Sequence, residues 1–226
     1  ERWLTESEIE SGADIADRRA LGFHIPGRWD RVFEVNKCLL QPDPSNAIRN
    51  RIGELAREKG WTFYHPTERV GWLRSMMIRN NLAGDFMLII QTANRDETGR
   101  KELTEMLLEE FPQIKSLWFT VNSKQNDSIY DLDLELIHGD EVIIEEMPAY
   151  KGGRSMQFRI GPKSFYQTNP EQASELYRIA LDYAEVDGDS LVYDLYTGTG
   201  TIALYLAQQA GKVIGVEGVE DAVIDA

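Results

Sequence analysis

Residues 189–218 read DSLVYDLYTGTGTIALYLAQQAGKVIGVEG and carry the strongest structural signal in the chain. A short apolar run over 191–193 precedes a glycine-rich turn at 194–201. A helical apolar pattern follows, and a second apolar run, 212–216, ends at Glu217. The order of strand, glycine turn, helix, strand and acid predicts the first βαβ unit of a doubly wound parallel sheet.

The glycines and acids of this unit indicate its ligand. Gly198 and Gly200 permit backbone conformations and a close ligand approach that a Cβ atom would block. A dinucleotide site needs a third glycine, where Ala203 stands instead, whereas Glu217 can accept two hydrogen bonds from a ribose diol. Asp194 suits a cationic ligand such as S-adenosylmethionine. The pattern therefore favours a methyl donor over a nicotinamide, and over the alternative of an ordinary βα turn without a ligand.

Composition limits the class of protein. The chain has 226 residues, of which 42% are hydrophobic, so we expect one large domain or two small ones. The net charge of −14 argues against tight contact of this chain with a phosphate backbone. One cysteine, Cys38, excludes an internal disulfide framework. Without a membrane-spanning run or an export signal, we predict a cytoplasmic protein with no membrane partner.

The two ends of the chain lead to a further expectation. The chain begins at Glu1 without a methionine and stops at Ala226, inside a new helical pattern. A doubly wound sheet needs several more strands than two. We therefore expect a piece of a longer protein, which would be a monomer, or a weak dimer that pairs through the open edge of the sheet.

Residues 1–160 predict an α+β domain. The apolar patterns place strands and helices in mixed order. The expected strands cover 32–35, 73–80, 85–92, 114–121, 131–137, 141–146 and 154–160, and the expected helices cover 45–60 and 101–111. We expect strands 131–137 and 141–146 to pair around the turn at 138–140, and Ser45 to cap the first helix.

Residues 161–226 predict the start of a Rossmann-like domain, which places the whole chain in the α/β class. Asn169 is a good N-cap, and Pro170 suits the first position of a helix. The expected helix has an apolar stripe of six residues, namely Ala173, Leu176, Tyr177, Ala180, Leu181 and Ala184.

Several segments together resemble the RNA (uracil-5-)-methyltransferase family. Three lie in the second half: SFYQTNP at 164–170, DLYTGTG at 194–200 and GVEG at 215–218. Four upstream segments resemble the central domain of the family, especially in members that act on 23S ribosomal RNA: LGFHIPGR at 21–28, VNKC at 35–38, LRSMMIR at 73–79 and IHGDEVIIE at 137–145. The FYQTN segment at this distance before the glycine turn is the most specific signal.

The resemblance implies S-adenosylmethionine-dependent methylation of uracil C5 in RNA. Residues 1–160 would be the central domain and 161–226 the truncated N-terminal part of a class I methyltransferase domain. The RNA would be 23S ribosomal RNA, with transfer RNA as the alternative; a non-catalytic module that binds S-adenosylmethionine or RNA is a further alternative. In the family a cysteine adds to uracil C6, C5 takes the methyl group, and a base removes the C5 proton. That cysteine and that base lie in later segments, so we expect this chain alone to be inactive.

The resemblance also assigns site residues. The predicted donor-binding residues are Gln167, Asp194, Tyr196, Gly198, Gly200, Thr201 and Glu217. Tyr196 could instead pack in the core, and Phe165 and Tyr166 are expected to pack.

The resemblance places Cys38 where the family keeps the fourth ligand of a [4Fe-4S] cluster, whose other three cysteines would precede Glu1. The alternative is a small buried hydrophobic residue. One thiolate cannot hold a cluster, so we predict no iron in this chain and a candidate ligand in the full-length protein. Because the transfer RNA enzymes of the family generally lack the cluster, Cys38 also argues against that alternative.

Overall fold

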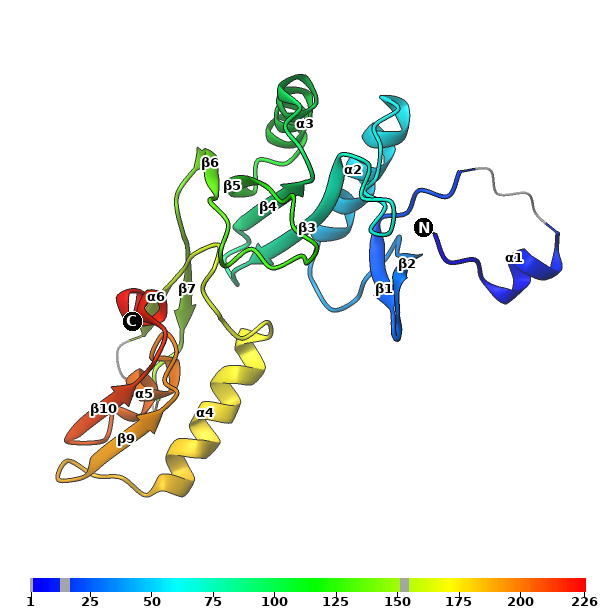
Figure 1. The fold of residues 1–226 in the computed structure, drawn as a ribbon. Coiled ribbons are helices and arrows are strands. Elements are labelled where there is room, and N and C mark those ends of the chain that lie inside the picture. Colours follow the sequence, from blue (N-terminus) through cyan, green and yellow to red (C-terminus); the bar gives the residue numbers. More distant parts are fainter. Residues whose placement is uncertain (1, 13–16, 151–154) are drawn as a thin grey trace. The chain divides into compact units, whose positions relative to one another are not determined.

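The computed structural model describes residues 2–12, 17–150 and 155–226. The chain divides into two compact units, each of which is described by itself. The first unit combines Glu1–Ile78 with Leu88–Ile137, and the second combines Arg79–Met87 with His138–Ala226. Figure 1 shows the course of the chain through the labelled helices and strands.

The first part of the chain contains a short hairpin and a four-stranded sheet. Its elements, in order, are α1 (Glu6–Glu10), β1 (Gly22–Ile25), β2 (Arg28–Glu34), α2 (Ser45–Glu58), β3 (Leu73–Asn80), β4 (Phe86–Thr92), α3 (Glu97–Glu110), β5 (Ile114–Val121) and β6 (Glu135–Gly139). Strands β1 and β2 are antiparallel. The larger sheet has the order β3-β4-β5-β6 (Figure 1).

Strand β4 lies in the middle of this sheet, and all seven of its residues are buried. Its near-continuous apolar sequence is typical of a strand that is covered on both faces. Helix α2 buries the stripe Ile48, Ile52, Leu55 and Ala56, and α3 buries Leu103, Met106 and Leu107. Their spacing of three and four residues is the helical period that the sequence shows.

The later part of the chain contains the predicted βαβ unit. Its elements are β7 (Ile143–Met147), β8 (Met156–Ile160), α4 (Pro170–Ala184), β9 (Leu191–Leu195), α5 (Thr201–Leu206), β10 (Lys212–Val216) and α6 (Glu220–Asp225). Strands β9 and β10 are parallel, with α5 as the crossover between them, as predicted. One core joins these elements and contains Met147, Tyr150, Phe158, Ala173, Tyr177, Leu181, Tyr205 and Leu206.

The predicted pairing of strands 131–137 and 141–146 is wrong. Strand β6 lies next to β5, and β7 pairs with β8 in antiparallel register instead. The register places Ile143 opposite Ile160 and Glu145 opposite Phe158, and all four side chains are buried. Burial of this shared face stabilises the β7–β8 pair, whereas the 138–140 turn carries no such cross-strand pairs.

Helices α2 and α4 begin in different ways. Asn169 caps α4 as predicted, because its Oδ1 accepts a hydrogen bond from the Gln172 amide at 3.1 Å. The predicted cap of α2 is wrong: Pro44 is the N-cap residue, and Ser45 is the first helical residue. Ser45 is fully buried, and its hydroxyl donates to the Gln41 carbonyl at 3.4 Å instead of accepting from the helix.

The apolar stripe of α4 is narrower than predicted. Ala173, Tyr177 and Leu181 are buried, whereas Leu176 is 58% exposed. Residues 138–160 pack in the same compact unit as the βαβ elements. The domain boundary between residues 160 and 161 stays a prediction. It comes from the resemblance to the family and does not coincide with the division into compact units.

The described helices include none that is both long and apolar enough to span a bilayer.

Arg74 on β3 generates a first prediction. Its side chain is 2% exposed, and its guanidinium donates to the carbonyl oxygens of Asn122, Lys124 and Asn126 at 2.7–2.9 Å. The change Arg74→Met should lower the free energy of unfolding by about 3 kcal/mol, because three carbonyls lose a charged donor and one of them belongs to Asn122, which is fully buried. Urea denaturation measures this change.

Arg95→Met is the matched control. Arg95 is 73% exposed and pairs with Glu97 at 3.6 Å, so its loss should cost less than about 1 kcal/mol. Equal losses in the two variants would show that Arg74 does not organise the 122–126 loop.

Candidate functional site

The turn after β9 is held against the end of β10. The amide groups of Tyr196 and Thr197 both donate to the Val216 carbonyl, at 2.9 and 3.1 Å. The Thr197 hydroxyl donates to Oδ2 of Asp194 at 2.7 Å. The turn that the sequence marks as glycine-rich is therefore fixed at the carboxyl ends of two parallel strands. This is the edge at which open α/β sheets bind their ligands.

Backbone conformation explains the glycines. Gly198 and Gly200 have φ angles of +57° and +77°, in the left-handed region where a Cβ atom is strained. Tyr196 has φ +63° although it is not glycine. Its side chain is 91% exposed, so the alternative of core packing is wrong for Tyr196. Such conformations concentrate at binding and active sites.

Glu217 closes the turn from the other side. Its Oε2 accepts from the Gly198 amide at 2.9 Å, and its Oε1 accepts from the Gly218 and Val219 amides at 2.7 and 2.9 Å. The amides of Val219, Gly198 and Gly218, in this order of effect, hold the pKa of Glu217 below its ordinary value. An ionised carboxylate has about four acceptor positions, so one position remains for a ligand hydroxyl.

Seven residues are predicted to bind the methyl donor, and six of them lie together at this turn, namely Asp194, Tyr196, Gly198, Gly200, Thr201 and Glu217. Thr201 begins α5, and its hydroxyl lies 3.3 Å from the hydroxyl of Tyr177 on α4. Gln167 is exposed in the loop before α4, and the contacts of the described residues do not join it to the turn. Among its neighbours, Tyr166 packs as expected, whereas Phe165 is 68% exposed, so the expected packing is wrong for Phe165.

Sequence reasoning missed three residues that shape the turn. Thr197 bonds to Asp194, and Gly215 leaves room for the Thr197 side chain, since a Cβ at Gly215 would lie 2.9 Å from Thr197 Cγ2. Tyr177 bonds to Thr201 from α4. The D-x-x-T spacing is a signal for the first contact, whereas no local pattern indicates the second.

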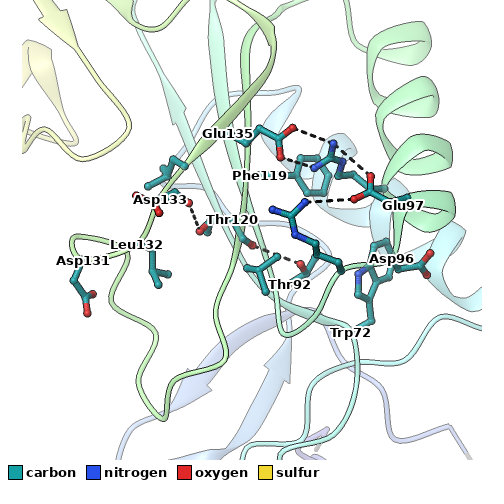
Figure 2. Close-up of a pocket in the computed structure, with 14 residues that line it drawn as sticks. Trp72, Thr92, Asp96, Glu97, Phe119, Thr120, Asp131, Leu132, Asp133 and Glu135 are labelled. Atoms are coloured by element: carbon teal, nitrogen blue, oxygen red, sulfur yellow. Dashed lines mark hydrogen bonds and ion pairs between the residues drawn. The ribbon is translucent and has the colours of Figure 1, made fainter.

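A cavity of about 570 Å³ lies in the first compact unit (Figure 2). Several of the charged side chains that line the cavity form ion pairs with one another. Arg100 donates to both oxygens of Glu135 at 2.7 and 3.1 Å and lies 3.5 Å from Glu97, and Asp96 accepts from the Gly99 amide. These contacts raise the pKa of Arg100 and lower that of Glu135. The cavity contains none of the predicted site residues, so we assign its ion pairs to the support of α3 and β6.

Cys38 is partly exposed after β2. Asn46 brackets it, since Oδ1 accepts from the Cys38 amide at 2.7 Å and Nδ2 donates to the Cys38 carbonyl at 3.0 Å. The described residues contain no cluster of three His, Cys, Asp or Glu side chains that could hold a metal ion. A [4Fe-4S] cluster needs four ligands, so the residues of this chain do not fit one.

Comparison with known proteins adds three findings. The chain is 42% identical over 228 residues to an uncharacterized RNA methyltransferase of Bacteroides thetaiotaomicron. The alignment covers 100% of the chain and 49% of that relative. It is 44% identical over 230 residues to an uncharacterized RNA methyltransferase of Porphyromonas gingivalis, which covers 100% of the chain and 48% of that relative. The chain thus spans about half the length of these curated relatives. No protein-family model matches the chain.

The third finding concerns a solved structure. The tRNA (uracil-54, C5)-methyltransferase of Pyrococcus abyssi in complex with S-adenosyl-L-homocysteine superposes with a TM-score of 0.70 at 23% identity. The match covers 91% of this chain and 48% of that chain. At this identity the likeness establishes the fold. The predicted α/β class with a Rossmann-like second part is confirmed.

The pH dependence of Glu217 is a second prediction. Because the folded pKa is lowered, the contribution of the carboxylate is present above its ordinary pKa and is lost as pH falls through the lowered pKa. We expect the Gly198 amide to lose protection from hydrogen exchange in that range. NMR titration of the Glu217 carboxyl carbon gives the pKa, and amide exchange gives the protection.

Glu217→Gln is the control, since its Gly198 amide should exchange without this acid-dependent step. A Glu217 carboxyl that titrates at or above the ordinary value of about 4.3 would contradict the three-amide arrangement.

Proposed function

We propose that this chain is the central domain and the first part of the donor-binding domain of an S-adenosylmethionine-dependent RNA methyltransferase. The turn closed by Glu217 is the observation that carries the proposal, because it places two acids and two left-handed glycines at one sheet edge. The alignment of two relatives named RNA methyltransferase along the whole chain supports it.

The residues of the turn fit such a donor. The free acceptor position of Glu217 suits a ribose hydroxyl, and the carboxylate of Asp194 suits a ligand with a positive charge. Gly198 has open space where a Cβ would lie, so a ligand can approach its backbone. S-adenosylmethionine supplies an electrophilic methyl group when it is bound. We propose that Gln167 also contacts S-adenosylmethionine, because its side-chain amide can both donate and accept hydrogen bonds.

We further propose that the methylated atom is C5 of uracil, and that the RNA is 23S ribosomal RNA, with transfer RNA as the alternative. The resemblance of the SFYQTNP and central-domain segments supports this choice. No residue of this chain is proposed as catalytic: its share is donor binding. A net charge of −14 is unfavourable for contact with RNA phosphates, so we assign most RNA contacts to other parts of the protein.

Cys38 and the cellular location stay predictions. We propose Cys38 as a cluster ligand in a longer protein, where other cysteines would complete the set. Iron analysis of the complete gene product, purified without air, tests this assignment. A cytoplasmic location is likewise proposed from the sequence.

A donor-binding experiment on the complete gene product that contains this chain provides the third prediction. Glu217→Ala should weaken S-adenosylhomocysteine binding roughly 10- to 100-fold, because a hydrogen bond to a charged group contributes about 1.5–3 kcal/mol. Isothermal titration measures the dissociation constant. Glu220→Ala is the matched control, since Glu220 is an exposed acid three residues away. Equal binding by the two variants would remove Glu217 from the donor site.

The substrate is tested separately. The complete gene product with labelled S-adenosylmethionine should produce 5-methyluridine, and ribosomal and transfer RNA from a deletion strain should show which RNA loses it. The proposed reaction would be overturned if the enzyme methylated another base, or if RNA from the deletion strain kept all of its 5-methyluridine.

A further inference from the structure

The loop 161–169 carries Gln167 into α4, and one arginine from a distant strand holds it. Arg79 lies near the end of β3. Its Nη1 donates to the Ser164 carbonyl at 2.7 Å, across 85 residues of sequence. Ser164 is 7% exposed, and its hydroxyl accepts from the Gly161 amide at 3.0 Å. The main chain three residues before Gln167 is therefore fixed by a charged hydrogen bond that is buried on the Ser164 side.

Tyr166, directly before Gln167, fixes the next part of the loop. Its ring packs against Phe158 on β8 with the ring centroids 5.8 Å apart. Its hydroxyl is buried, and burial together with the nearby carboxylate of Glu145 raises the pKa of Tyr166. Because the partly buried ring packs against the core, the backbone of Tyr166 is restricted, and the exposed Gln167 side chain starts from a defined position.

The turn that follows Arg79 is itself bound to β7. The carboxylate of Glu145, which is 1% exposed, accepts from the Leu82 amide at 3.2 and 3.3 Å. Nδ2 of Asn81 donates to the Ile144 carbonyl at 2.7 Å, and Oδ1 of Asn81 accepts from the Asp85 amide at 2.8 Å. These contacts fix the β3–β4 turn on both sides, and therefore fix the point from which Arg79 reaches Ser164.

We infer that Arg79 is a positioning residue for donor binding, which acts through the Ser164 carbonyl to hold Gln167 in place. The inference rests on the proposed function, because it gives the loop 161–169 a purpose in that site. The loop contains neither helix nor strand, so individual hydrogen bonds and packing contacts set its conformation. A site residue on such a loop needs a supporting shell of this kind to keep its geometry.

The test compares Arg79→Met with Arg79→Lys in the complete gene product. Arg79→Met removes the donor and keeps most of the apolar stem. It should raise the dissociation constant for S-adenosylhomocysteine about tenfold, as expected when one charged hydrogen bond is lost. The KM for S-adenosylmethionine should rise similarly with little change in kcat, and amides 165–168 should exchange faster. Arg79→Lys, which retains a charged donor, should recover part of the affinity.

Arg159→Met is the matched control. Arg159 is an exposed arginine on β8 in the same compact unit, so its loss should leave binding and loop exchange unchanged. If Arg79→Met does not fold, Arg79→Gln tests the same contact, because it replaces the charged donor to the Ser164 carbonyl by a shorter neutral one. It should also weaken donor binding and speed exchange at 165–168.

The outcomes separate this inference from the proposed function. Unchanged donor affinity in a folded Arg79→Met protein, or a faster-exchanging loop with unchanged affinity, overturns the positioning role alone. Absence of donor binding by the unmodified protein overturns the proposed function, and the positioning role with it. Weaker binding in Arg79→Met with recovery in Arg79→Lys supports the inference.

Discussion

The carboxylate of Glu217 is the contact on which the candidate site depends. Its bond to the Gly198 amide joins the turn after β9 to the turn after β10, and its bonds to Gly218 and Val219 orient the second turn. Two strand ends thereby act as one binding edge. The left-handed φ angles of Gly198 and Tyr196 are held by these contacts and by the Val216 carbonyl. The turn is formed before a ligand arrives, which lowers the entropic cost of binding.

The core of the second compact unit supports the turn after β9. The core residues of β7 and β8 pack with those of α4 and α5, so segments on both sides of the predicted boundary at residue 160 share one interior. Buried Glu145 and Asn81 bind the β3–β4 turn to this unit. The loop that carries Gln167 is therefore supported by residues from the segment that we predict to be the central domain. If the proposed function holds, hydrogen bonds and packing link this segment to the methyl-donor site.

Net charge and chain coverage limit what this chain does alone. A charge of −14 is unfavourable for a phosphate backbone, and the chain matches about half of its relatives' length. The structure shows a sheet edge made of backbone amides, glycines and acids, which we propose as the binding site of the methyl donor. Several charged residues that line the cavity in the first unit already have partners, such as Arg100 with Glu135 and Asp96 with the Gly99 amide, so the cavity by itself does not identify a site.

The sequence by itself determined the α/β class, the βαβ unit, the start of α4 and the set of residues in the turn, because these depend on local periodicity, capping and glycine spacing. Tertiary structure alone decided that β7 pairs with β8, that Ser45 is buried rather than a cap, and that Tyr196 is exposed. It also brought Arg79 to Ser164 and Tyr177 to Thr201. These contacts depend on long-range packing, and a local pattern carries no record of which distant partner satisfies a buried group.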